Sequence, residues 1–97
     1  MDGLTDRAFA AELLARRGRA GLSQPELAEL AGIKIRTYRR LEQAERGCNL
    51  DELARLAGAL GTHMTELAYA IEQRVKTGAV LPSSRAADEW RGALGID

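Results

Sequence analysis

The sequence predicts an all-α fold, a bundle of five helices with a short C-terminal extension. The 97-residue chain is rich in Ala and Leu, which are strong helix formers, and has few β-branched residues. It contains only two prolines, Pro25 and Pro82. Apolar residues also recur every three or four positions between helix start and stop signals, which is typical of amphipathic helices.

Length and composition indicate one domain of a globular protein. The chain is 45% hydrophobic and 29% charged, and its formal net charge is zero. Its single cysteine, Cys48, excludes an internal disulfide, and no apolar run approaches the roughly 20 residues of a membrane span. Acidic residues at Asp2 and Asp6 argue against a secretory signal. We therefore expect cytoplasmic localisation, with a domain over residues 1–78 and a tail over 79–97.

The first helix is predicted over residues 4–19 and ends near Gly18 and Gly21. One face of this helix is apolar, with Phe9, Ala10, Leu13 and Leu14. Arg17 follows Leu13 by four positions, so this charged residue falls on the same face.

The second helix is predicted to begin at Ser23 and to end at Gly32. Ser23 and Glu26 form the S-x-x-E capping box, and Pro25 is tolerated in the first helical turn. The predicted apolar stripe consists of Leu27, Leu30 and Ala31. Gly32 then suits a left-handed C-cap.

The third helix is predicted over residues 35–43 and has two chemically different sides. One side combines apolar residues with an acid: Ile35, Tyr38, Leu41 and Glu42. The other side is polar and basic: Arg36, Thr37, Arg39 and Arg40. Together with Lys34, these arginines put four cations and no acid between Ile33 and Leu41. This concentration of unopposed charge is unusual in a chain of zero net charge.

The fourth helix is predicted to begin at Asn49, where Asn49 and Glu52 form a second capping box, and to close at Gly61. Its apolar positions are Leu50, Leu53, Leu56, Ala57 and Leu60. The fifth helix is predicted over residues 62–76, with an apolar stripe of Met64, Leu67, Ala68, Ile71 and Val75. Beyond Gly78, we expect an extended segment over 79–82 and a short helix over 84–94.

Residues 23–42 have the layout of a helix-turn-helix, with a tight turn at 32–34. In this motif the second helix enters the DNA major groove. Cations displace the counterions of the phosphate backbone, and the arginine fork can bond guanine O6 and N7 together. A helix N-terminus also favours a phosphate oxygen. The candidate DNA-binding residues are Ser23, Gln24, Lys34, Ile35, Arg36, Thr37, Arg39, Arg40 and Arg46.

Residues 14–67 resemble the helix-turn-helix of the phage repressor and Cro family, also called the Xre family. The resemblance rests on matching positions along the chain, which are Arg17, Gly21–Gln24, Leu27–Ala28, Gly32–Ile33, Tyr38, Glu42 and Leu53–Leu60. It implies a repressor-like bundle and a sequence-specific transcriptional regulator, most often a repressor. Such proteins usually bind near-palindromic DNA as dimers, with half-sites roughly 34 Å apart.

Arg17 and Glu42 each lie at the inward edge of an otherwise apolar helix face. A buried lone charge is costly, so each side chain needs a partner, and their opposite signs make them suitable mates. The resemblance implies a structural ion pair between them, which would fix the first helix to the end of the third. The alternative is that both side chains extend outward to solvent.

The sequence departs from the family pattern near the third helix. Lys34 occupies the usual Ser or Thr N-cap position and cannot accept a hydrogen bond there, so that cap is missing. Ile35 replaces a polar residue that often reads bases, and it either contacts a thymine methyl group or packs inward. Ala44 replaces a common glycine, so the turn there is expected to differ. In the loop 44–48, Arg46 is left as the one expected phosphate contact.

Three functions remain open from the sequence. The first is a DNA-binding regulator that forms a homodimer through helix 62–76 and the tail. The second is an antitoxin or other protein-partner-binding regulator on the same scaffold, and the third is an adaptor that has lost DNA binding. Trp90 in the tail either packs on its own domain or contacts a partner subunit.

An enzyme is not expected, because no nucleophile, base and orienting group occur together. His63 is the only histidine, and one histidine with one distant cysteine makes no metal site. We therefore expect neither a cofactor nor a metal.

Overall fold

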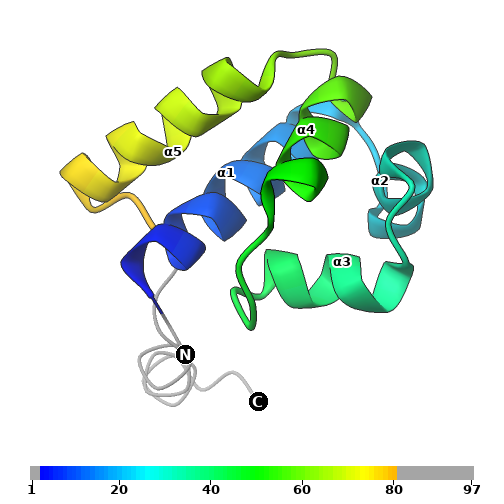
Figure 1. The fold of residues 1–97 in the computed structure, drawn as a ribbon, viewed down its shortest axis with the longest axis horizontal. Coiled ribbons are helices and arrows are strands. Elements are labelled where there is room, and N and C mark those ends of the chain that lie inside the picture. Colours follow the sequence, from blue (N-terminus) through cyan, green and yellow to red (C-terminus); the bar gives the residue numbers. More distant parts are fainter. Residues whose placement is uncertain (1–2, 81–97) are drawn as a thin grey trace.

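The computed structural model describes residues 3–80. Within this range it contains helices and no strands, and Figure 1 shows their arrangement. The helices are α1 (Leu4–Ala20), α2 (Gln24–Ala31), α3 (Ile35–Glu42), α4 (Leu50–Ala59) and α5 (Met64–Thr77). The predicted all-α class and the five helices are confirmed, and the helix ends differ from the predicted ones by at most two residues.

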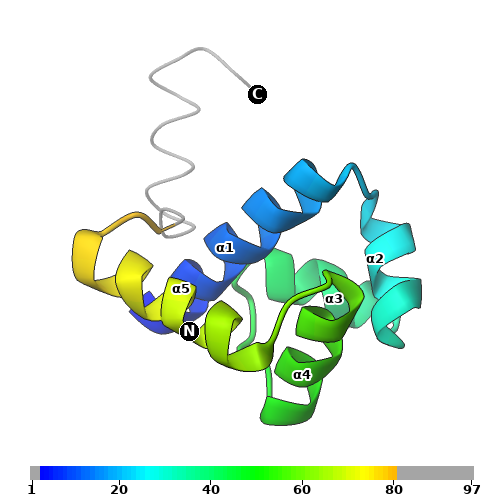
Figure 2. The same ribbon diagram turned by 90° about the horizontal axis from the view of Figure 1, so that it is seen from above.

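Helix α1 is the central element of the bundle. It packs against α5 on one side and against α3 on the other, while α4 contacts both α2 and α5 (Figures 1 and 2). Every helix contributes to the core through fully buried side chains, the largest being Leu13, Leu27, Tyr38, Leu41, Leu56 and Leu67. The short helices α2 and α3 are therefore held by the longer ones and do not depend on their own helix propensity.

The two predicted capping boxes fix where α2 and α4 begin. Ser23 Oγ accepts from the Glu26 backbone N–H at 3.2 Å, and the Glu26 carboxylate accepts from the Ser23 N–H at 2.8 Å. The Asn49–Glu52 pair makes the same reciprocal bonds at 2.7 and 3.0 Å. At the other end of α2, Gly32 adopts a left-handed conformation with φ of 68°. Start and stop signals thus place the turn between α2 and α3 as predicted.

Four predicted apolar positions are exposed instead of buried: Leu14 (41%), Leu30 (62%), Leu50 (73%) and Ala68. The buried stripe of α2 is centred between Leu27 and Ala31, and Leu30 points away from it around the helix. Leu14 is likewise turned away from the stripe that contains Leu13. Leu50 is the first residue of α4, and a side chain in a first turn can extend past the neighbouring helices.

Helix α5 ends at Thr77, and its C-cap residue Gly78 adopts a left-handed conformation with φ of 77°. Val80, the last described residue, packs partly against the core. The remainder of the predicted extended segment, the predicted helix 84–94 and Trp90 lie outside the described residues. Among residues 3–80, no helix combines the length and the apolar character needed to cross a membrane.

Candidate nucleic-acid interface

Helix α3 buries one side and exposes the other. Tyr38 and Leu41 are completely buried, and Glu42 is 6% exposed. The opposite side carries Arg36 and Arg39, which are exposed and form no ion pair within residues 3–80. Arg40 is exposed as well, and its 3.8 Å contact with Glu45 joins two half-exposed side chains, so it contributes little. The predicted division of α3 into a core side and a basic side is therefore present in the fold.

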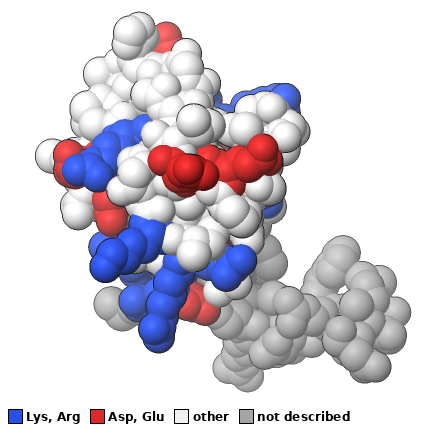
Figure 3. All heavy atoms as spheres, turned by 90° about the vertical axis from the view of Figure 1, so that its right-hand side faces the viewer, with Lys and Arg blue, Asp and Glu red and all other residues white. Residues whose placement is uncertain are grey.

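The basic side chains also gather in space. Figure 3 shows Lys and Arg side chains at the lower part of one face, on the side of the molecule where α3 lies in Figure 1. Most of the acidic side chains on this face lie above them, although one acidic side chain is visible among the lower basic ones (Figure 3). Although the net charge of the chain is zero, this edge of the surface is therefore rich in basic side chains.

The first turn of α3 combines an exposed cation with half-buried residues. Lys34 is the N-cap residue with extended backbone, and its side chain makes no capping hydrogen bond, as expected. Ile35 is half-buried and packs against the core, which favours the inward alternative. Thr37 is also half-buried.

The turn between α2 and α3 is braced from α4 by Arg55, which sequence analysis did not identify. Its Nη1 donates to the Gly32 carbonyl at 3.2 Å, and its Nε lies 2.9 Å from the Asp51 carboxylate. This contact ties the turn that precedes the basic helix to a third element of the bundle.

Glu42 anchors the other end of α3. Arg17 donates to it twice, from Nε at 2.9 Å and from Nη2 at 2.8 Å. Gln24 Nε2 donates at 3.0 Å, and the Tyr38 hydroxyl donates to the same carboxylate. One carboxylate therefore joins α1, the start of α2 and α3. The expected pair of Arg17 and Glu42 is formed, and the structure adds two donors that sequence analysis did not assign.

These contacts fix the charge states of the anchor. Burial by itself raises the pKa of Glu42, but hydrogen bonds from Arg17, Tyr38 and Gln24 bring it below its ordinary value of 4.5. The bond to Glu42 raises the pKa of Arg17. Burial, followed by the Glu42 bond, raises the pKa of Tyr38 far above its ordinary value of 10.0. At neutral pH, the anchor therefore contains a carboxylate, a guanidinium and a neutral phenol that donates.

Three of the candidate DNA-binding residues outside α3, which are Ser23, Gln24 and Arg46, already have partners within the chain. The Ser23 backbone N–H is bonded to Glu26, although the Ser23 hydroxyl keeps its own proton as a donor. The Gln24 amide donates to Glu42. Arg46 Nη1 lies 3.0 and 3.1 Å from the two Glu52 oxygens, so its charge is opposed. The structure thus brings the α3 residues together at the surface and places Gln24 and Arg46 in internal contacts.

Ala44 shows how the loop after α3 accommodates a departure from the family pattern. This residue is 3% exposed, and it is the only non-glycine residue with positive φ (58°) in residues 3–80. The left-handed conformation costs an L-residue about 1–2 kcal/mol. The chain therefore adopts at Ala44 a conformation that glycine adopts more readily, and it gains a buried methyl group in return.

A second buried carboxylate, that of Glu12, was not identified from the sequence. Glu12 is 6% exposed. It accepts from Arg74 Nε at 2.7 Å and from Arg16 Nε, and Arg19 Nη2 lies 3.9 Å away. These contacts join α1 to α5. The i,i+4 spacing of Glu12 and Arg16 was a usable signal, whereas Arg74 lies 62 residues from Glu12 and gave none.

Comparisons with known proteins agree with this geometry. The family model described as "Helix-turn-helix domain" matches residues 8–70, which is most of the described chain. No curated protein matches the chain in sequence. Among solved structures, the chain is similar to the clp gene regulator ClgR from Corynebacterium glutamicum, with a TM-score of 0.72 and 21% identity, covering 97% of this chain and 94% of that one. At this identity, the similarity shows a shared fold.

The family match bears on function because a helix-turn-helix domain implies DNA binding. It supports a DNA-binding regulator and not an enzyme, as the sequence had predicted. The same match confirms the resemblance to the phage repressor and Cro family, which had implied a DNA-binding regulator. The chain therefore belongs to the helix-turn-helix domain family.

Proposed function

We propose that this protein is a sequence-specific transcriptional regulator, and a repressor, which inserts α3 into the major groove of its operator. The observation that carries the proposal is the exposed side of α3, where Arg36, Arg39 and Arg40 project from a helix whose other side is locked into the core. A rigid helix can hold three guanidinium groups in register with base edges and phosphates. The resemblance to phage repressors supports the repressor role, and the neighbour described as a gene regulator supports a role in transcription.

The contacts differ in strength among the candidate residues. Arg36, Arg39 and Arg40 supply the base-edge and phosphate contacts, since their forks are free to bond guanine O6 and N7. Lys34 binds a phosphate from the start of α3. The remaining members of the set make weaker contacts, because they are half-buried or already engaged within the chain: Ser23, Gln24, Ile35, Thr37 and Arg46.

We further propose that the protein acts as a homodimer. Residues 1–78 form the DNA-binding domain, and the surface that meets the second copy combines α5, predicted from sequence as helix 62–76, with the tail 79–97. Helix α5 exposes Tyr69, which is 64% accessible and is an aromatic residue of the kind enriched at interfaces. Two-fold symmetry would pair two copies of α3 with half-sites one DNA turn apart, roughly 34 Å.

The test is a comparison of two double variants on a duplex selected from a random pool by the parent protein. Arg36→Ala with Arg40→Ala should weaken specific binding by about 2–6 kcal/mol, since each base contact contributes about 1–3 kcal/mol. The slope of log K against log salt should also decrease by about 0.9 for each lost phosphate contact. Fluorescence anisotropy at several salt concentrations measures both quantities.

The matched control is Arg19→Ala with Ala54→Glu, which lowers the net charge by the same two units at exposed positions on α1 and α4. We expect this variant to bind the selected duplex nearly as tightly as the parent. Equal losses in the two double variants would show that only net charge matters, and the assignment of α3 as the recognition helix would then be wrong.

A further inference from the structure

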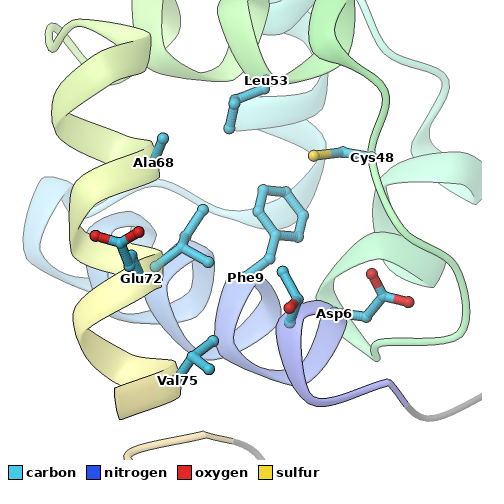
Figure 4. A pocket seen from close by; sticks show the side chains of 9 residues that line it. Asp6, Phe9, Cys48, Leu53, Ala68, Glu72 and Val75 are labelled. Atoms are coloured by element: carbon cyan, nitrogen blue, oxygen red, sulfur yellow. The ribbon is translucent and has the colours of Figure 1, made fainter. Parts of the chain in front are cut away.

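An apolar groove lies on the molecule between α1 and α5, away from the basic side of α3. Its volume is about 450 Å³. The apolar lining comes from α1, the loop before α4, α4 and α5: Phe9, Cys48, Leu53, Ala68, Ile71 and Val75. Figure 4 shows the Phe9 ring projecting into the middle of the groove, with Asp6 and Glu72 on opposite sides. A groove of this size and lining suits an occupant with a large apolar side chain.

The segment that leaves α5 is held by hydrogen bonds at the end of that helix. At the end of α5, the Ala79 N–H donates to the Arg74 carbonyl at 3.1 Å, and Arg74 Nη1 donates to the Ala79 carbonyl at 2.8 Å. Arg74 is held in turn by buried Glu12. Figure 1 shows the segment after α5 turning back toward the N-terminal end of α1, the helix that contributes Thr5, Asp6 and Phe9 to the groove.

The sequence beyond Val80 carries an occupant with matching chemistry. Trp90 is the only tryptophan of the chain, and Leu94 follows it by four positions. Arg91, next to Trp90, supplies a cation for a groove with a carboxylate on either side. Ten residues can span at most about 33–36 Å, so Trp90 can reach the groove from Val80 without stretching the connection.

We infer that residues 81–97 dock onto their own chain, with Trp90 in the groove between α1 and α5. A buried tryptophan covers about 150–250 Å² of apolar surface, which accounts for both the open groove and an otherwise isolated aromatic residue. The docked tail then forms, together with the exposed side of α5, the surface that a second copy meets. No residue that lines the groove belongs to α3, so tail docking can be tested in the absence of DNA.

The chain contains its own pair of probes for this contact, because Trp90 is the sole tryptophan and Cys48 the sole cysteine. In the full chain, Trp90 fluorescence should be blue-shifted and protected from iodide quenching. Labelling of Cys48 by iodoacetamide should be slow, and Trp90→Ala should accelerate it by about tenfold or more, as expected if an open state is a minor population of 10% or less. Rates are compared at one pH, since burial raises the pKa of the Cys48 thiol to about 11.

A second variant tests the contact from the side of the groove. Ala68 is an exposed residue of α5 that lines the groove, so Ala68→Glu should block docking without disturbing the core. We expect its Trp90 emission to shift to that of an exposed indole. The matched control is Ala54→Glu, another exposed helical alanine, which does not line the groove and should leave the emission unchanged. Circular dichroism checks that both variants keep the helical fold.

Three results would overturn the inference. The first is solvent-exposed Trp90 in the parent chain. The second is a Cys48 labelling rate that does not respond to Trp90→Ala, which would place the tail elsewhere. The third is a Trp90 blue shift that disappears on dilution, because a concentration-dependent contact identifies a second copy, and not the same chain, as the occupant.

Discussion

Two buried carboxylates, Glu42 and Glu12, lie on opposite sides of α1 and are exposed to the same extent, 6%. Glu42 accepts from three different residues and is bound twice by Arg17, whose side chain is 19% exposed. Glu12 binds arginines that are more accessible, with side-chain exposures of 22% for Arg16 and 25% for Arg74. Both sites thus neutralise a buried carboxylate, but the arginines around Glu12 are more exposed to solvent than Arg17.

The difference shows which part of the bundle must be rigid. Glu42 belongs to α3 itself, and its partners come from α1 and the start of α2, so it fixes the orientation of the basic helix. Glu12 connects α1 with α5 and, through Arg74, with the segment that leads to the tail. Loss of Glu42 should therefore affect DNA binding and stability together, whereas loss of Glu12 should affect mainly stability.

The largest effect is expected from Glu42→Ala. This change leaves the half-buried Arg17 and the buried Tyr38 hydroxyl without their acceptor, and removing one member of a buried ion pair costs about 3–5 kcal/mol. Urea unfolding followed by circular dichroism measures the loss, and DNA affinity should decrease in the fraction that remains folded. The control is Glu29→Ala, an exposed position on α2, which should change stability by no more than about 0.5 kcal/mol. A loss below about 1 kcal/mol for Glu42→Ala would mean that the anchor is not needed.

A smaller effect is expected from Glu12→Ala. Its arginine partners can turn toward water when the carboxylate is gone, so the cost should be that of lost charged hydrogen bonds, about 1.5–3 kcal/mol. Under conditions where the variant stays folded, DNA affinity should match that of the parent. If Glu12→Ala proved as destabilising as Glu42→Ala, or weakened DNA binding equally, the proposed division between the two sites would be wrong.

The same comparison shows what could be predicted from sequence. Glu42 and Arg17 were identifiable because each interrupts an apolar helical face, and the capping boxes and Gly32 located the helix ends between them. Glu12 also interrupts such a face, next to Leu13, but its principal partner lies on α5, and periodicity does not show which helices pack together. Leu30 was misplaced for the same reason, because a helical pattern gives the neighbours on one helix and not the width of the face that the bundle covers.

The candidate interface was predictable in part. The basic side of α3 followed from the period of 3.6 residues, which depends only on local geometry. The engagement of Arg46 with Glu52 and of Gln24 with Glu42 was not predictable, because each depends on how a loop or a helix start meets another element. Ala44 has a positive φ, which an alanine rarely adopts, so the tertiary contacts of the loop outweighed a local preference.

The smallest effect concerns the pH dependence of stability. For both carboxyls, burial alone raises the pKa, but the arginine bonds at Glu12, and those of Arg17, Tyr38 and Gln24 at Glu42, hold it below the ordinary 4.5. The unfolded chain therefore binds more protons in acid. Each carboxylate stabilises the fold fully above about pH 4.5, and this contribution is lost as the pH falls through the lowered pKa.

Glu42→Gln and Glu12→Gln should each flatten the acid side of the stability profile, measured as unfolding free energy from neutral pH downward. The flattening should be greater for Glu42→Gln, because more donors hold the charged form of Glu42 than that of Glu12. Part of the slope should persist in both variants, since the capping carboxylates Glu26 and Glu52 also have lowered pKa values. A greater flattening for Glu12→Gln would reverse the order of the two sites, and Glu12 would then be the more enclosed charge.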